Sequence, residues 1–156
     1  MEPRGLRFDD ARRFFAAVRP IGERREVENS LFLGVAKRLA SSGGEAFMIA
    51  LQSGAELLAA ALRTPPYDLS ICAGSRTNIE RLADAVIETG EPMPAVIGLE
   101  GAAGWFADRY RGGLGLRQKT RLRLTLYTLA AVIPPAVRAP GELRVATQSD
   151  RNWLID

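Results

Sequence analysis

Histidine is missing from all 156 residues of the chain. Its absence excludes Ser-His-Asp and Cys-His catalysis, histidine zinc sites and histidine proton shuttles within this chain. Cysteine is nearly absent too. The single Cys72 lies in an apolar run with Leu69, Ile71 and Ala73, which predicts a buried, inert thiol rather than a nucleophile. Because no disulfide is needed, a reducing, cytoplasmic setting is the expected one.

Long apolar runs are also lacking. The longest, residues 46–51 and 57–62, are far too short to cross a bilayer, and the first ten residues contain no apolar stretch of the signal-peptide type. We therefore expect a soluble protein with no membrane partner. The formal net charge is +3, from 21 basic and 18 acidic residues, so composition neither requires nor excludes an anionic partner.

The common nucleotide and esterase motifs are absent. Gly113-Leu-Gly115 lacks the third glycine of a dinucleotide fingerprint, and the sequence contains neither a Gly-x-x-x-x-Gly-Lys-Ser/Thr loop nor a Gly-x-Ser-x-Gly elbow. The acidic row Glu80, Asp84 and Glu88 has helical spacing and is interpreted as a solvated helix face rather than a cation site. We predict no catalytic residue and no metal site in this chain.

What the sequence does contain is an alternation of strand and helix patterns. It predicts an α/β (α+β) fold with a mixed, mostly antiparallel central sheet and helices on both faces. The expected strands are residues 6–8, 46–52, 55–62, 69–73, 95–98 and 121–127, although a helical interpretation of 55–62 stays open because that segment is rich in alanine and leucine.

Four helices are expected between these strands. The first helix ends at Pro20, and its apolar positions are Ala11, Phe14, Phe15 and Val18. The second ends at Gly43-Gly44 and has Asn29 or Ser30 as an internal cap; its apolar positions are Val27, Leu31, Val35 and Leu39. The third begins with a Thr77–Glu80 capping box and ends at Gly90, and the fourth, with Ala103, Phe106 and Tyr110 on one side, ends at Gly112-Gly113.

The C-terminal part has a different organisation. We expect a domain over residues 1–133, a proline-rich linker over 134–142 and, over 143–156, the truncated beginning of a second domain. In that beginning, residues 143–145 would be a strand, Thr147 with Asp150 would cap a helix, and the first buried positions would be Trp153, Leu154 and Ile155.

Three segments and the order of elements resemble the GNAT acetyltransferase superfamily, and more specifically the N-terminal half of two-domain bacterial GNAT proteins. The segments are Glu28-Asn-Ser-Leu-Phe-Leu-Gly34, Ala60-Ala-Leu-Arg-Thr-Pro-Pro-Tyr67 and Leu122-Arg-Leu-Thr-Leu-Tyr-Thr-Leu129. In those proteins a degenerate GNAT-like half precedes the catalytic half, and residues 143–151 look like the first strand and helix start of that catalytic half. The resemblance covers nearly the whole chain, and only Arg-Thr-Pro-Pro-Tyr is distinctive.

The hallmark of the superfamily is a Gln/Arg-x-x-Gly-x-Gly/Ala loop before the third helix, whose backbone amides hold the diphosphate of acetyl-CoA. Glycine stands at the fourth place only after Arg19, Arg109 and Arg138, and in each case the sixth place fails. The corresponding junction, residues 73–78, lacks the motif. Gly74, Ser75 and Arg76 are therefore only weak candidates for binding an anion, with an ordinary capped turn as the alternative.

Two further sites have both a functional and a structural interpretation. Arg63 and Tyr67 flank two prolines and could line a substrate cleft, or they could belong to a rigid strand crossover. The basic run Arg117, Lys119, Arg121 and Arg123 could meet RNA or CoA phosphates. It lacks interleaved aromatics and is explained equally well by charge protection of an edge strand, so nucleic acid is not an expected partner.

The resemblance implies the noncatalytic N-terminal domain of an N-acetyltransferase that transfers acetyl from acetyl-CoA to a small-molecule or peptide amine. Its partner would be the catalytic GNAT domain of the same polypeptide, and the chain alone would be inactive and bind no cofactor. The alternatives are a stand-alone protein-interaction module, which includes a homo-oligomer, and a compact acetyltransferase with an unconventional coenzyme loop at residues 74–78.

Overall fold

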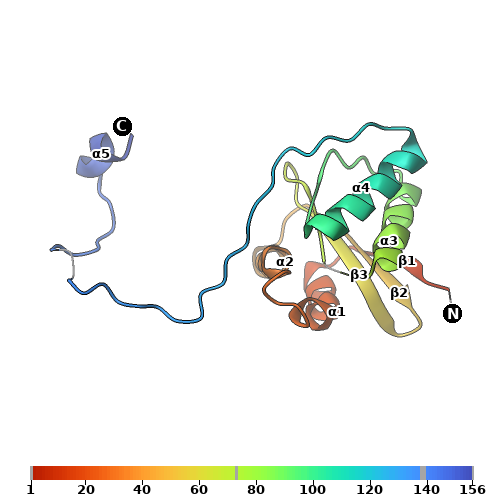
Figure 1. Cartoon of the computed structure of the whole chain (residues 1–156), viewed down its shortest axis with the longest axis horizontal. Coiled ribbons are helices and arrows are strands. Elements are labelled where there is room, and N and C mark those ends of the chain that lie inside the picture. Colours follow the sequence, from red (N-terminus) through yellow and green to blue (C-terminus); the bar gives the residue numbers. More distant parts are fainter. Residues whose placement is uncertain (1, 73, 138–139, 156) are drawn as a thin grey trace. The chain divides into compact units, whose positions relative to one another are not determined.

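The computed structural model describes residues 2–72, 74–137 and 140–155, apart from the side chain of Ile155. The chain divides into two compact units, Met1–Leu126 and Tyr127–Asp156. The first unit contains a five-stranded sheet between two pairs of helices (Figure 1). Its elements are β1 (Arg4–Phe8), α1 (Ala11–Glu23), α2 (Ser30–Ser42), β2 (Phe47–Ser53), β3 (Glu56–Arg63), β4 (Leu69–Ile71), α3 (Arg76–Glu88), β5 (Val96–Ile97) and α4 (Glu100–Leu114).

The strands lie in the order β1-β2-β3-β4-β5. The first three neighbouring pairs are antiparallel and β4 with β5 is parallel, with Leu69 opposite Val96. The chain passes from β4 to β5 through α3, so these two strands run in the same direction. The predicted class, a mixed and mostly antiparallel sheet with helices on both faces, is confirmed.

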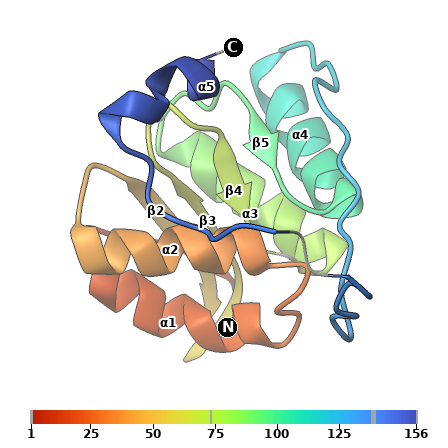
Figure 2. The same ribbon diagram turned by 90° about the vertical axis from the view of Figure 1, so that its left-hand side faces the viewer.

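The two faces of the sheet bury separate hydrophobic clusters, because successive strand residues point to opposite sides. On one face Phe14, Val18 and Phe32 of α1 and α2 pack against Met48, Leu62 and Cys72; on the other, Ile79, Leu82 and Phe106 of α3 and α4 pack against Ile49, Leu51 and Leu69. Figure 2 shows α1 and α2 lying side by side.

The centre of β3 is made of alanine alone. Ala60 faces the α1–α2 cluster, Ala59 and Ala61 face the α3–α4 cluster, and all three are fully buried. This strand confirms the strand interpretation of residues 55–62.

Several helix boundaries were predicted wrongly. Pro20 does not end α1, which continues to Glu23 although a proline inside a helix removes one backbone hydrogen bond; Pro20 lies on the exposed side of α1. Gly112 and Gly113 do not end α4. That helix runs to Leu114 and is closed by Gly115, whose φ is +67°. A Cβ at Gly113 would lie 2.8 Å from Ile87 Cδ1, so this glycine lets α3 and α4 approach closely.

The predicted apolar face of the second helix is confirmed at Leu39, but before it the buried positions are displaced by one residue. The buried residues of α2 are Phe32, Ala36 and Leu39, while Val27 and Leu31 are about half exposed. Asn29 precedes α2 and makes no side-chain cap; its Nδ2 donates to the carbonyl of Gly22 at 3.0 Å. Asn29 therefore joins the end of α1 to the start of α2.

The last predicted strand is also wrong. Residues 116–129 form neither helix nor strand, and all of them are exposed. A strand needs a partner with which to exchange backbone hydrogen bonds, and within the described residues this segment pairs with none of the five strands. Every helix in the described parts of the chain is too short or too polar to cross a membrane.

Candidate functional site

The start of α3 is the place where the resemblance would put a coenzyme loop. Ser75 has an extended backbone, and its Oγ accepts a hydrogen bond from the Asn78 N–H at 3.3 Å. The cap is therefore Ser75, and the predicted Thr77–Glu80 capping box is wrong. The Ser75 oxygen thus serves the helix end as the acceptor for one backbone N–H. Ala73, which precedes this turn and ends the predicted 69–73 strand, lies outside the described residues.

The two other candidate residues of this turn are an ion-paired arginine and a glycine with room for a side chain. The Arg76 Nε donates to Glu80 Oε1 at 2.7 Å along the helix, and this hydrogen bond raises the Arg76 pKa above its usual value. A Cβ placed on Gly74 would meet the Leu58 carbonyl oxygen at 3.4 Å and Ile79 Cδ1 at 3.5 Å, which are ordinary contacts. The position does not require glycine, and these residues do not fit the backbone cradle of a coenzyme diphosphate.

The acidic row on α3 is largely neutralised by arginines. Glu80 is bound by Arg76, and Asp84 receives a bidentate pair from Arg109, with Nε to Oδ1 at 2.6 Å and Nη2 to Oδ2 at 3.0 Å. Among the residues that the structure describes, no group of three or more acidic or cysteine side chains is arranged to hold a metal ion. The row has the ion-paired, solvated character expected of an exposed helix face.

Arg63 and Tyr67 lie at the two ends of the turn between β3 and β4. The Arg63 Nε donates to the Tyr67 carbonyl at 3.0 Å, and the Tyr67 N–H donates to the Thr64 carbonyl at 3.0 Å. Between them the Pro65–Pro66 peptide is cis. The structure therefore brings the two residues together through the main chain, while the Tyr67 ring is largely exposed. These contacts suit the crossover interpretation, and a role in substrate binding stays a prediction.

A shallow hollow of about 480 Å³ lies beside Arg63. Its wall includes Met93 and Tyr110, which hold each other: the Tyr110 hydroxyl accepts from the Met93 N–H at 3.0 Å and donates to the Glu91 carbonyl at 3.4 Å. The remaining wall comes from α3, from the loop before β5, from the end of α4 and from the segment after it: Ile87, Gly90, Glu91, Pro92, Pro94, Leu114 and Leu116. Sequence reasoning missed this hollow, because no motif links Arg63 to a tyrosine 47 positions later; only the fold brings β3 beside the end of α4.

The basic run is partly ion-paired. The Arg121 guanidinium contacts the Asp68 carboxylate, and Arg123 Nη1 lies 3.0 Å from Glu100 Oε1. Asp68 comes directly before β4, and Glu100 is the first residue of α4. Two of the four basic side chains are thus engaged by carboxylates of the first unit, which leaves a weaker positive stripe than the sequence suggests.

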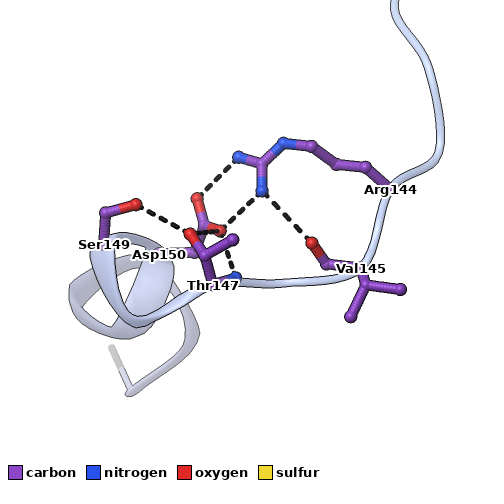
Figure 3. A network of polar contacts seen from close by, with 5 residues as sticks. All are labelled: Arg144, Val145, Thr147, Ser149 and Asp150. Carbon is purple, nitrogen blue, oxygen red and sulfur yellow. Dashed lines mark hydrogen bonds and ion pairs between the residues drawn. The ribbon is translucent and has the colours of Figure 1, made fainter.

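In the second unit, the predicted cap of Thr147 and Asp150 is confirmed (Figure 3). The Asp150 carboxylate receives both Nη atoms of Arg144, at 2.6 and 2.7 Å, and the Thr147 N–H at 2.7 Å. These contacts, with Arg144 first, hold the pKa of Asp150 well below its usual range. They fix the start of a short 3₁₀ helix, η1 (Gln148–Asp150), which continues into α5 (Arg151–Ile155).

The expected strand over residues 143–145 is wrong, because these residues form neither strand nor helix. Trp153 and Leu154 are 89% and 69% exposed, since a lone helical turn cannot bury them, and their burial against a second domain stays a prediction. The prediction for the Ile155 side chain lies outside the described residues, as do positions 138–139 of the predicted linker. Comparisons with protein-family models, curated proteins and solved structures find no match for this chain.

Proposed function

We propose that this chain is the noncatalytic N-terminal domain of a two-domain GNAT N-acetyltransferase. The observation that carries the proposal is the sheet topology: three antiparallel pairs followed by the parallel β4–β5 pair, with α3 between its strands. From β1 to α4 this order of elements agrees with the order expected from the resemblance of residues 28–34, 60–67 and 122–129 to that family, whereas the expected last strand, residues 121–127, is not formed. A second domain of the same protein would bind acetyl-CoA and transfer its acetyl group to an amine.

The start of α3 supports the noncatalytic part of the proposal. The Ser75 hydroxyl caps the helix, the Arg76 guanidinium is bound to Glu80, and the Gln/Arg-x-x-Gly-x-Gly/Ala motif is missing. A diphosphate needs several free backbone N–H groups around a close turn, and this junction offers only an ordinary helix end. We derive no chemical step through the coenzyme in this chain.

The contribution of this domain would be to scaffold the acceptor pocket. The hollow bordered by Arg63, Met93 and Tyr110 combines Arg63 and Glu91 with a mostly apolar wall, and such a surface suits the non-reacting part of a small-molecule or peptide amine. A cytoplasmic location belongs to the same proposal and is supported by the single buried, free cysteine.

The proposal is tested on the reading frame that encodes this chain. We expect the frame to continue past Asp156 into a domain with the Gln/Arg-x-x-Gly-x-Gly/Ala motif. In calorimetric titrations the longer protein should bind acetyl-CoA, while the 156-residue chain should give no heat of binding. A stop codon directly after Asp156, or acetyl-CoA binding by this chain alone, would overturn the proposal.

The role of the hollow is tested in the longer protein. Arg63→Ala should raise the KM for the amine by about tenfold, the scale of one lost charge-assisted hydrogen bond, and should leave the KM for acetyl-CoA unchanged. Arg38→Ala, at an exposed position of α2 that does not line the hollow, is the matched control. Equal effects of the two substitutions would exclude a role of Arg63 in the acceptor pocket.

A second candidate function is a stand-alone protein-interaction module. It is favoured by the exposed leucines at 122, 124 and 126, which are 56–75% accessible, because exposed apolar rows often mark contact surfaces. A stop codon after Asp156 would favour this function over the first.

A further inference from the structure

Residues 120–128 leave a regular row of leucines uncovered. Leu122, Leu124 and Leu126 are 68%, 75% and 56% exposed, and they alternate with Arg121, Arg123 and threonine or tyrosine. In an extended chain, alternating residues point to opposite sides. All three leucines would therefore lie on one side of this segment, between Thr120 and Thr128, and the other side would carry Arg121, Arg123, Thr125 and Tyr127.

The same nine residues are nearly symmetric about Leu124. Antiparallel pairing of Thr-Arg-Leu-Arg-Leu-Thr-Leu-Tyr-Thr with a second copy, centred on this residue, would place Thr120 opposite Thr128, Arg121 opposite Tyr127, Leu122 opposite Leu126 and Arg123 opposite Thr125. No arginine meets another arginine in this register. Leu–Leu, Thr–Thr and Arg–Tyr neighbours are all favourable across strands, whereas like charges are not.

The polar side of the segment is already held by its own folded unit. The Arg121 guanidinium contacts Asp68, and Arg123 pairs with Glu100 at 3.0 Å. These ion pairs neutralise both arginines and anchor the middle of the segment beside β4 and α4, while the leucines stay exposed. Because the segment is already held in place in the single chain, it loses less conformational entropy when it pairs with a second copy.

We propose that residues 120–128 of two copies of this chain pair antiparallel about Leu124 and join them into a symmetric homodimer. The segment pairs with no strand in the described part of its own chain, so its backbone groups are available for such pairing. A C2 contact of this kind uses the same surface on both copies, as a self-complementary segment requires. The inference is independent of the proposed acetyltransferase role. Because a two-stranded contact is modest, we expect dissociation in the micromolar range.

Disulfide trapping tests the register. In a Cys72→Ala background, Leu124→Cys would face itself, with Cα atoms about 5 Å apart, which is within the reach of a disulfide. Leu122→Cys would be about 13 Å from its counterpart, four residues away along the strand, and too far to bridge. We expect Leu124→Cys to form cross-linked dimers at least tenfold faster than Leu122→Cys. An equimolar mixture of the Leu122→Cys and Leu126→Cys proteins should also cross-link, to about half the extent of Leu124→Cys, because only the dimers that contain one copy of each variant bring the two thiols within reach.

Sedimentation of the 156-residue chain between about 1 and 200 µM tests the dimer itself, since that range brackets micromolar dissociation. Leu124→Lys would bring two ammonium groups together on the symmetry axis and should raise the dissociation constant at least tenfold. Leu143→Lys is the control, because Leu143 is equally open to solvent and lies outside the segment. Far-UV circular dichroism should be the same for all three proteins, since neither position contributes to the core.

Three outcomes would overturn the inference. One is a monomer across the whole concentration range. The second is cross-linking of Leu122→Cys as fast as that of Leu124→Cys, and the third is a dimer that Leu124→Lys does not weaken. Each would show that this segment does not join the two copies in the proposed register.

Discussion

Removing the Tyr110 hydroxyl tests how the loop before β5 is held to α4. Tyr110 is 8% exposed, and its oxygen accepts the Met93 N–H at 3.0 Å and donates to the Glu91 carbonyl at 3.4 Å. Tyr110→Phe keeps the ring and its stacking on Phe106, whose centroid is 5.9 Å away. The substitution therefore isolates the two hydrogen bonds.

The expected loss follows from what remains after the substitution. Met93 is 9% exposed, so its N–H would stay inside without a partner, which costs about 1–3 kcal/mol. The bond to Glu91 is long, and its loss adds little. We expect a decrease of about 1.5 kcal/mol in the free energy of unfolding. With a urea m-value of about 1.5 kcal/mol/M, the midpoint should fall by about 1 M.

Urea unfolding followed by far-UV circular dichroism measures this change. The chain supplies its own controls, because the other two tyrosines are open to solvent: Tyr67 is 66% and Tyr127 is 86% exposed. Tyr67→Phe and Tyr127→Phe should each stay within about 0.5 kcal/mol of the parent. If the midpoint of Tyr110→Phe coincides with those of the two controls, the Met93 hydrogen bond does not stabilise the fold.

Three further predictions concern other parts of the chain. Gly98→Ala should lower the free energy of unfolding by about 1–3 kcal/mol in the same urea assay, because its Cβ would lie 2.6 Å from Ile71 Cγ1; an unchanged midpoint would contradict the close approach. Burial raises the pKa of Cys72 to about 11, so the thiol should not react with a disulfide reagent at pH 8 until urea unfolds the chain, and rapid reaction of the folded protein would contradict this. Asp150 has a lowered folded pKa, so its stabilising effect on the cap is complete above the usual carboxyl pKa and is lost as the pH falls through the folded value. In a carboxyl NMR titration, Arg144→Ala should move that pKa back up, and an unmoved pKa would refute the ion pair.

The elements that sequence predicted well are those whose pattern is fixed by local contacts. The apolar stripe Ile79, Leu82, Ala83, Val86 and Ile87 predicts one buried helix face. In α3 the first four are fully buried and Ile87 is partly buried. A turn at Ser53-Gly54 predicts the β2–β3 hairpin, and Gly54 has the positive φ, +61°, that favours glycine. In both cases neighbours in the sequence are also neighbours in the fold.

Predictions that depended on distant partners were less successful. The alternation of Leu122, Leu124 and Leu126 is that of a strand, but alternation does not supply the neighbouring strand that hydrogen bonding needs. Gly112 and Gly113 have the composition of a helix end, but Gly113 instead gives room for Ile87 of α3. Sequence could not show that contact, because it depends on how two helices pack.

For the candidate site, the sequence predicted the local features of the chain but not the contacts between distant residues. The absence of a coenzyme motif at residues 73–78 was readable directly, and the Ser75 cap and the Arg76–Glu80 pair agree with it. The pairing of Arg63 with the Tyr67 carbonyl was not readable, because it involves a main-chain atom. The hollow formed with Met93 and Tyr110 depends on tertiary packing alone.

The alanines at the centre of β3 limit how the two helical layers influence each other. A methyl group has no rotamer to change, so Ala59, Ala60 and Ala61 cannot absorb a shift by turning a side chain. A displacement of α1 or α2 can reach α3 and α4 through this strand only if its main chain moves, and that movement would be resisted by the hydrogen bonds to β2 and β4 on either side. At this strand, a side-chain rearrangement in the α1–α2 layer is therefore not passed on to the α3–α4 layer by a change of rotamer.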